Sequence, residues 1–112
     1  MALIYPRFDK RKQKVYKCAM IKTFANEETE SFWETGKSRR FPHAIHKRAT
    51  MRLLQLAAAV VVEDMRVLPS NHLEALKNDR AGQWSIRING QGRICFAFLD
   101  GNAFDVEIVD YH

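Results

Sequence analysis

The sequence predicts an α+β fold in which two N-terminal helices pack on one face of a small, mostly antiparallel β-sheet. Apolar residues recur at three- and four-residue steps in the first half of the chain, which is typical of an amphipathic helix. Beyond residue 72 the apolar period changes to two, which is typical of β-strands. Only short turns separate these later runs, and strands joined by short turns are antiparallel neighbours. A helical layer on one sheet face gives every element a partner for its apolar side.

The first helix is predicted to begin after Asn26, because an asparagine side chain can accept a hydrogen bond from the first helical turn. Three glutamates follow within four residues, and acids near a helix N-terminus interact favourably with the helix dipole. Phe32 and Trp33 would anchor this helix to the core. Gly36 can end it, because glycine tolerates the left-handed conformation of a helix C-terminus.

The second helix is predicted to start near Pro42, a residue suited to a first helical turn, after the basic linker "KSRRFP". We expect Lys47, Arg48 and Arg52 to lie on its other sides and to point into water. Its buried stripe recurs at steps of four, four, three and four: Ile45, Ala49, Leu53, Leu56 and Val60.

Five segments are predicted as strands. They are "MIKTF" (20–24), "HLEALK" (72–77), "QWSIRIN" (83–89), "RICFAFL" (93–99) and "AFDVEIVDYH" (103–112). The turns "NDRAG", "GQG" and "DGN" separate the last four segments and are rich in residues that favour turns.

Strand parity assigns the side chains to two faces of the sheet, since alternate residues point in opposite directions. The face away from the helices would carry Arg87 and Arg93, with Lys77 at the end of the preceding strand and Tyr111 beside His112 at the terminus. The bulky set is expected to meet the helices: Trp84, Ile86, Ile88, Ile94, Phe96, Phe98, Phe104, Val106 and Ile108.

A length of 112 residues is enough for one domain with one core. Residues 1–19 hold six bases and one acid, whereas residues 20–112 hold twelve of each, so the excess positive charge lies in the first segment. We expect 1–19 to be a flexible basic extension and Met20 to begin the domain. Such a segment could bind a polyanion, although a solvated arm is the commoner case.

Composition also indicates where the protein is located and whether it binds a cofactor. The longest apolar run, residues 56–62, is far too short to span a bilayer, and the first residues lack a signal-peptide pattern. Cys18 and Cys95 are too few for a disulfide scaffold. We therefore expect a cytoplasmic protein with reduced cysteines and no membrane partner. Without a CxxC pair or a His/Cys cluster, we expect neither a metal nor a cofactor.

The predicted set of two cations, a tyrosine and a histidine suits a phosphodiester substrate. Lysine and arginine bind phosphate and neutralise the charge that develops in an in-line displacement. In RNA the 2′-hydroxyl can be the nucleophile, and histidine can move a proton near neutral pH. The alternative is that Arg87 and Arg93 are ordinary charges on an exposed sheet face, and that His112 is an idle terminal residue.

The block "LEALKNDRAGQWSIRINGQGRICF", together with the ending "DVEIVDYH" and the start "MIKTF", resembles the HigB-type toxins of the RelE/ParE toxin superfamily. The likeness covers roughly residues 20–112. It implies a fold similar to microbial ribonucleases and an endoribonuclease that cuts mRNA in the ribosomal A site, without metal or cofactor. It also implies a cognate helix-turn-helix antitoxin of the HigA type. The toxin would reach operator DNA only through that antitoxin.

The resemblance also implies roles for individual residues. Lys77 and Arg93 match the phosphate-contacting bases, whereas Asp110, Tyr111 and His112 match a C-terminal functional triplet. Lys77, Arg93, Tyr111 and His112 are therefore the catalytic candidates. The candidates for substrate binding are Arg80, Arg87 and Asp110.

Two positions depart from the family pattern. Glu74 stands where several members have a histidine, and Gly92 stands where tryptophan commonly precedes the arginine. We assign no role to the nearby His72, so His112 remains the imidazole of the site. The terminal carboxylate beside it favours the protonated ring, which suits a general acid. A glycine at 92 is expected to leave a cavity or to loosen Arg93, which would weaken activity.

Two other functions remain open from the sequence. The chain could be a non-enzymatic toxin that binds DNA gyrase, as ParE relatives are thought to do. It could also be an attenuated toxin that acts mainly with its antitoxin as a co-repressor.

Overall fold

The computed structural model describes residues 21–110. The basic segment 1–19, its predicted boundary at Met20, and the pair Tyr111 and His112 lie outside the described residues. Within the described range the helices are α1 (Glu27–Thr35) and α2 (His46–Ala58). The strands there are β1 (Glu74–Ala75), β2 (Trp84–Arg87), β3 (Gly92–Leu99) and β4 (Asn102–Asp110). Short 3-10 turns in the same range are η1 (His43–Ile45), η2 (Val62–Arg66), η3 (Pro69–Asn71) and η4 (Asn78–Arg80).

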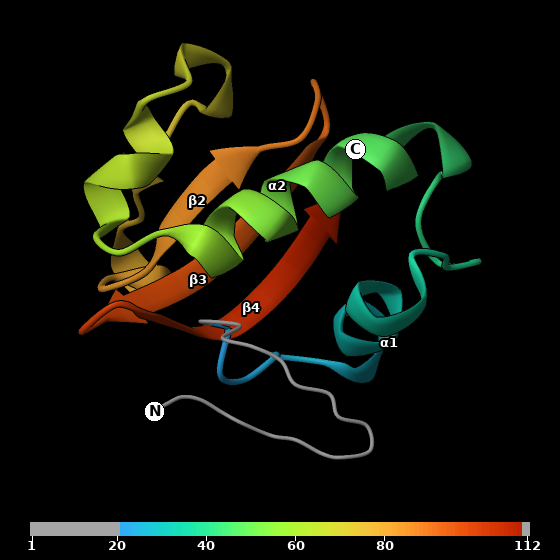
Figure 1. Ribbon diagram of the computed structural model, residues 1–112, viewed down its shortest axis with the longest axis horizontal. Helices are drawn as coiled ribbons and strands as arrows, with labels where there is room; N and C mark the ends of the chain where they lie inside the picture. The colour runs from blue at the N-terminus through green and yellow to red at the C-terminus, as the bar shows by residue number, and fades with distance from the viewer. Residues whose placement is uncertain (1–20, 111–112) are drawn as a thin grey trace.

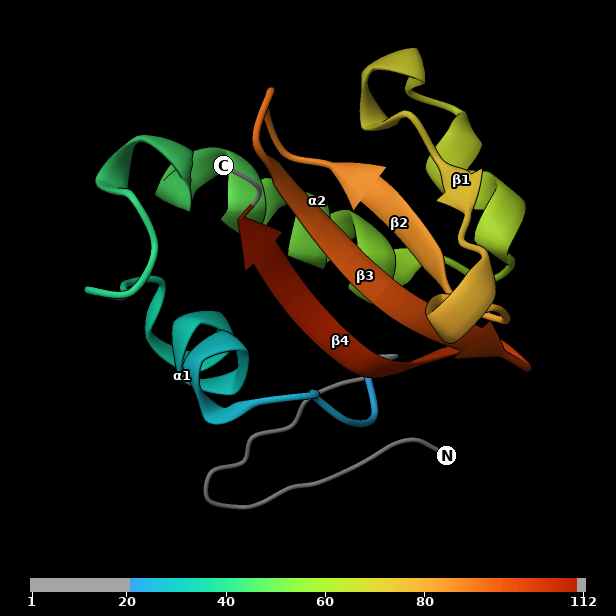
Figure 2. The same cartoon turned by 180° about the vertical axis from the view of Figure 1, so that it is seen from behind.

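The strands form one antiparallel sheet in the order β1-β2-β3-β4. Helix α2 lies across one face of this sheet, and α1 lies along its β4 side (Figure 1). Seen from behind, β2, β3 and β4 present the other face, which no long helix covers (Figure 2). The predicted α+β architecture is therefore confirmed.

Helix α1 begins and ends where the capping residues Asn26 and Gly36 predict. The Asn26 side chain accepts a hydrogen bond of 2.9 Å from the Thr29 backbone N–H. At the other end Gly36 has a φ of 77°, and its N–H donates to the Phe32 carbonyl at 2.7 Å. The buried Thr29 hydroxyl accepts a hydrogen bond from the Ile108 N–H at 3.1 Å, which fixes α1 to β4.

Helix α2 is preceded by η1, so Pro42 starts a 3-10 turn that continues into the helix. The predicted stripe is buried, with one exception. Val60 is 68% exposed, because α2 ends at Ala58 and the helical period no longer applies two residues later. The buried members of the stripe are Ile45, Ala49, Leu53 and Leu56.

The N-terminal part of the domain runs beside β4 without forming a strand of its own. In place of the strand predicted over 20–24, Ile21 and Phe24 make isolated parallel bridges to Ala103 and Val106. The strand predicted over 72–77 also shortens to Glu74–Ala75. Both segments lie at edges of the sheet, so each has a neighbouring strand on one side only.

A β-bulge at Asp105 divides β4 into two halves. Asp105 has a φ of 53°, and the register changes between the pairs Ala97↔Phe104 and Cys95↔Glu107. One extra residue on β4 reverses the alternation of its side chains. Phe104 therefore shares a face with Ala97, and its predicted place on the helix side is wrong.

The core lies between α2 and the near face of the sheet. Phe32 of α1 also reaches it, and its ring contacts Phe41 edge-on at a centroid distance of 6.0 Å. Fully buried aliphatic side chains fill the space between helix and sheet: Leu53, Leu56, Ile86, Ile88, Ile94 and Val106.

The turn after α2 depends on one carboxylate. Asp64 accepts backbone hydrogen bonds from the N–H groups of Val60 at 2.8 Å and Val61 at 3.2 Å, and these bonds lower the pKa of its carboxyl. A carboxyl whose folded pKa lies below its unfolded value of about 3.9 stabilises the fold above that pH. The contribution is lost as pH falls through the folded pKa.

We therefore expect Asp64→Asn to lower the thermal midpoint slightly at neutral pH. The difference from the unmodified chain should shrink as the pH falls from about 4 through the lowered folded pKa of Asp64, because protonation then removes the charge that the asparagine lacks. Thermal melts followed by circular dichroism across this range measure the effect. A gap that widens in acid would contradict the assignment to Asp64.

Candidate active site on the open face of the sheet

Two arginines face each other on the uncovered side of the sheet. Arg87 of β2 stands directly opposite Arg93 of β3, and Val109 of β4 lies opposite Arg93 on the other side. Residues directly opposite one another share a face. The core residues Ile86 and Ile94 take the alternate positions, so both arginines lie on the face away from α2. Strand parity predicts this placement from the sequence.

Arg93 is held in place by three contacts. Its Nε donates to the Ser85 hydroxyl at 2.9 Å, and its Nη2 donates to the His72 backbone carbonyl at 3.0 Å. The same nitrogen lies 3.1 Å from a carboxylate oxygen of Glu74. Only 18% of the Arg93 side chain is exposed, whereas 61% of the Glu74 side chain is. The guanidinium is thus pre-positioned, and the carboxylate beside it is free to move in solvent.

Both the side chain and the backbone of Arg87 are fixed by hydrogen bonds that involve backbone carbonyls. Its Nε donates to the Asn89 carbonyl at 3.0 Å. Its own carbonyl accepts a hydrogen bond of 3.1 Å from the Nε of Arg52, and Arg48 Nη1 donates to the Ile88 carbonyl at 3.3 Å. Two arginines of α2 therefore fix the end of β2, where Arg87 emerges.

Arg52 was expected to point into water, and that expectation is wrong. The residue is 8% exposed because its side chain crosses to the carbonyl of Arg87, and its Nη2 also donates to the Ser70 hydroxyl at 3.4 Å. Burial lowers the pKa of the guanidinium, and the nearby charge of Arg48 lowers it further. The guanidinium therefore carries a desolvation cost, against which its hydrogen bonds to Arg87 and Ser70 act.

Replacing Arg52 with methionine is expected to lower the free energy of unfolding by about 1–3 kcal/mol, since the partly buried Arg87 carbonyl loses its donor. Urea denaturation measures this loss. Arg48→Met is the comparison on the same helix: Arg48 is exposed and loses a single bond of 3.3 Å to the Ile88 carbonyl, so its replacement should cost less. A more stable Arg52→Met variant would mean that desolvation of the charge outweighs its hydrogen bonds.

The other two predicted cations lie around η4. Lys77 is exposed and immediately precedes this turn, so it lies beyond the end of β1. Arg80 bridges from η4 to β4, with Nη2 3.0 Å from a carboxylate oxygen of Glu107 and Nη1 3.0 Å from the Gln83 side-chain oxygen. A phosphate that binds Arg80 must therefore compete with Glu107.

The chain leaves β4 close to the arginine pair. Asp110 is the last residue of β4, and its backbone pairs with Gly92, the residue before Arg93. The side chain of Asp110 and the residues Tyr111 and His112 lie outside the described part of the site. Their assigned roles stay predictions.

Gly92 is buried and closely surrounded. A Cβ atom built on it would lie 3.2 Å from the Asn89 side-chain oxygen and 3.7 Å from Ile88. The same oxygen accepts a hydrogen bond of 2.6 Å from the Gly92 N–H. Asn89 thus takes up space beside Gly92, and Arg93 keeps its three contacts, so the expected loosening of Arg93 is not seen.

Sequence reasoning missed two partners of Arg93. Glu74 was noted only as a departure from the family pattern, and Ser85 was not singled out. Their positions carry a signal, since Glu74 pairs with Ser85 across β1 and β2. Seeing that pairing requires the register between the two strands, which the sequence does not give.

Residues 21–110 show no sign of a metal site or a membrane span. No group of three or more His, Cys, Asp or Glu side chains in that range is placed to hold a metal ion. Neither described helix has the length and apolar character needed to cross a bilayer. The arginine pair and its partners are therefore the strongest site candidate on this face.

Comparison with known proteins identifies the family. Residues 22–112 match the HigB-like toxins, described as the RelE-like toxin HigB of type II toxin–antitoxin systems. The chain belongs to the HigB-like toxin family. It is 31% identical over 93 residues to endoribonuclease HigB of Proteus vulgaris, covering 83% of this chain and all of that protein. It is 34% identical over 87 residues to toxin HigB-1 of Vibrio cholerae serotype O1, covering 77% of this chain and 92% of that protein.

The fold of this HigB-like chain is similar to that of a solved structure. The YoeB dimer of Staphylococcus aureus superposes with a TM-score of 0.52 at 19% identity, covering 86% of this chain and 99% of that one. The likeness supports the RelE-like α+β fold predicted from the sequence. Membership of a type II toxin–antitoxin family implies an antitoxin partner for this HigB-like chain.

Proposed function

We propose that this toxin is a metal-independent endoribonuclease that cleaves mRNA in the ribosomal A site and so inhibits translation and growth. The observation that carries the proposal is the opposed pair Arg87 and Arg93, with Arg93 fixed by Ser85 and His72, at the sheet end where β4 leads to the terminal residues. The name of the Proteus vulgaris relative, an endoribonuclease, supports the same activity.

The proposed reaction is an in-line attack of a 2′-hydroxyl on its neighbouring phosphate. Glu74 accepts the 2′-proton, because its exposed carboxylate lies beside the phosphate-binding guanidinium of Arg93. The new O2′–P bond forms while the P–O5′ bond breaks, and His112 gives its proton to the leaving oxygen. The products are a 2′,3′-cyclic phosphate and a 5′-hydroxyl. Arg93 and Lys77 stabilise the charge on the phosphoryl oxygens.

Binding of RNA would rearrange the Arg93–Glu74 contact. A phosphate is a good bidentate partner for a guanidinium, and it competes with the carboxylate for Nη2. Glu74 is largely exposed, so it can turn toward the 2′-hydroxyl as the phosphate takes its place. Arg93 stays in position through Ser85 and His72.

Primer extension on cellular mRNA after induced expression tests the proposal. Cuts at defined codon positions that disappear when ribosomes are withheld in a purified assay are the expected result. Intact mRNA together with a DNA-damage response would instead indicate a gyrase-binding toxin and would overturn the nuclease proposal.

The exposed Glu74 gives a sharper test. We expect Glu74→Gln to lower the cleavage rate about 10²-fold, because the amide cannot accept the 2′-proton. Glu63→Gln is the matched control, since Glu63 is also exposed and paired with an arginine, at 2.7 Å. Single-turnover cleavage of a model mRNA on ribosomes measures both variants.

The Arg93–Glu74 contact also favours a second candidate function. If the carboxylate only neutralises Arg93, the chain is an attenuated toxin that acts mainly with its antitoxin as a co-repressor. Glu74→Gln would then raise cleavage. In either case we propose a helix-turn-helix antitoxin of the HigA type as the partner, contact with operator DNA only through it, and a cytoplasmic location.

A further inference from the structure

We infer that a basic hollow between α1 and α2 binds the phosphates of single-stranded RNA, away from the proposed cleavage site. The hollow has a volume of about 790 Å³. Five of its seven lining residues are basic or histidine: Lys37, Arg39, His43, His46 and Lys47. The choice of RNA rests on the proposed function, whereas the surface is defined by residues that the cleavage reaction does not use.

The charge of this surface is not balanced by nearby acids in the sequence. Residues 36–62 contain no aspartate or glutamate, and they hold six lysines and arginines. Residues 20–112 as a whole carry equal numbers of bases and acids, so this segment is a strong local excess. Of its arginines, Arg40 faces an acid from another segment, Glu28, at 3.7 Å between exposed side chains. Such a concentration of charge attracts a polyanion.

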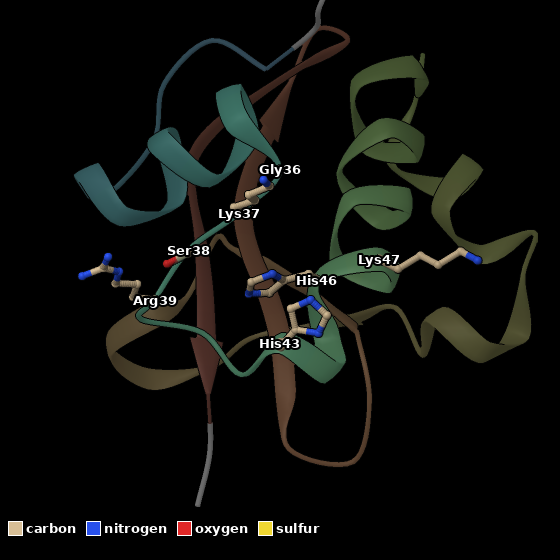
Figure 3. Close-up of a pocket in the computed structure, with 7 residues that line it drawn as sticks. All are labelled: Gly36, Lys37, Ser38, Arg39, His43, His46 and Lys47. Carbon is tan, nitrogen blue, oxygen red and sulfur yellow. The ribbon is translucent and has the colours of Figure 1, made fainter.

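The centre of the hollow is pre-formed. His46 donates from Nε2 to the Phe41 carbonyl at 3.0 Å, because a carbonyl can only accept. Its ring is also packed edge-on against Phe32 at a centroid distance of 5.2 Å. His43 lies 5.1 Å from His46 and is exposed. The two rings lie in the middle of the hollow, and Arg39 and Lys47 extend to opposite sides (Figure 3).

This combination fits single-stranded RNA better than an acidic protein. Single strands are held by cations along the backbone and by aromatic rings on which bases stack, and histidine is one of these rings. His43 offers an exposed ring between two flexible cations. An acidic peptide would use the cations alone.

A second hollow, which shares Lys47 with the first, reaches the residues that follow β2. It has a volume of about 430 Å³ and is lined by Lys47, Arg48, Ile88 and Asn89, among others. Arg48 donates to the Ile88 carbonyl, and Ile88 follows Arg87 directly. Basic side chains therefore extend from Arg39 through Lys47 to Arg48 at the end of β2, on the helix side of the sheet, and an RNA strand bound along them would pass around this end of the sheet to reach the arginine pair.

The test compares two double variants that remove the same charge. Arg39→Gln with Lys47→Gln changes the hollow, whereas Arg66→Gln with Lys22→Gln changes exposed bases on other elements. The probe is a fluorescein-labelled RNA of about 12 nucleotides with 2′-O-methyl groups, which lacks the 2′-hydroxyl needed for cleavage. Fluorescence anisotropy gives its Kd at several salt concentrations.

The hollow variant is expected to bind about tenfold more weakly, with a log–log salt slope smaller by about 1.4, which is the loss of two phosphate contacts on a single strand. The control should change Kd less than about twofold. Equal Kd values for the two double variants would overturn the inference. An equal loss of affinity for a polyglutamate peptide of matched charge would overturn the assignment to RNA.

This assay separates the inference from the proposed function, because cleavage is not measured. A protein that cuts no mRNA but shows the tenfold difference would contradict the nuclease proposal and leave the RNA-binding surface intact.

Discussion

Replacement of Arg93 by glutamine is expected to lower the rate of mRNA cleavage by about 10²–10³-fold, the usual cost of losing one donor that stabilises transition-state charge. Arg93 is the best-fixed cation on the open face, with Ser85, His72 and Glu74 around it. A pre-positioned guanidinium stabilises the phosphoryl charge without reorganising first. The loss should appear in kcat, measured by single-turnover cleavage on ribosomes.

Two further variants make the Arg93 result specific. Arg93→Lys keeps the charge but cannot reproduce the planar fork, so an intermediate rate is expected. Arg66→Gln removes an exposed arginine paired with Glu63 and should leave the rate unchanged. Because Arg93 also ties β1 to β2, a thermal melt must accompany each rate. A folded Arg93→Gln variant with an unmodified rate would remove Arg93 from the site.

Replacement of His112 by asparagine is expected to lower cleavage by about 10²–10⁴-fold, as is typical when a general acid is lost. Without it the 5′-oxygen must leave as an unprotonated alkoxide. The acid limb of the pH–rate profile should persist, whereas the alkaline limb set by the imidazole should disappear. A short RNA with a good leaving group at O5′ should recover much of the lost rate, because such a group needs no proton.

His72→Asn is the matched control for His112. His72 is exposed, and its backbone has a φ of 47°, a conformation that asparagine adopts readily. Its backbone carbonyl, which holds Arg93, remains in the variant. Its rate should stay close to that of the unmodified chain. A fall for His72→Asn with no fall for His112→Asn would move the general acid from the terminus to His72.

Several features of the fold follow from short stretches of sequence. Asn26 and Gly36 end α1 as predicted, since both signals act within one helical turn. The alternation in residues 84–87 and 93–96 determines the faces of β2 and β3, so it also places Arg87 and Arg93 on one face. The helix ends and the strand faces depend on residues only a few positions apart in the chain, so they can be read from the sequence.

The immediate surroundings of Arg93 depend on contacts between distant segments. Arg93 reaches back 21 residues to His72, and its ion pair with Glu74 joins β3 to β1. Sequence reasoning noted Glu74 only as a departure, because nothing in the chain order brings it to Arg93. Lys77 and Arg80 were predicted with the arginine pair, yet Arg80 is paired with Glu107, 27 residues away.

By itself, then, the sequence determined the fold class, the ends of α1 and the common face of Arg87 and Arg93, because periodicity and capping are local properties of the chain. Only the tertiary structure decided that Arg52 is buried against β2, that a bulge at Asp105 moves Phe104 to the other face, and that Glu74 pairs with Arg93. Each of these depends on which backbone carbonyl, strand register or charge a distant segment supplies. The extra residue at Asp105 changes the face on which Phe104 lies, and the Arg87 carbonyl draws Arg52 out of water. Neither effect is visible in the order of apolar and polar residues along the chain.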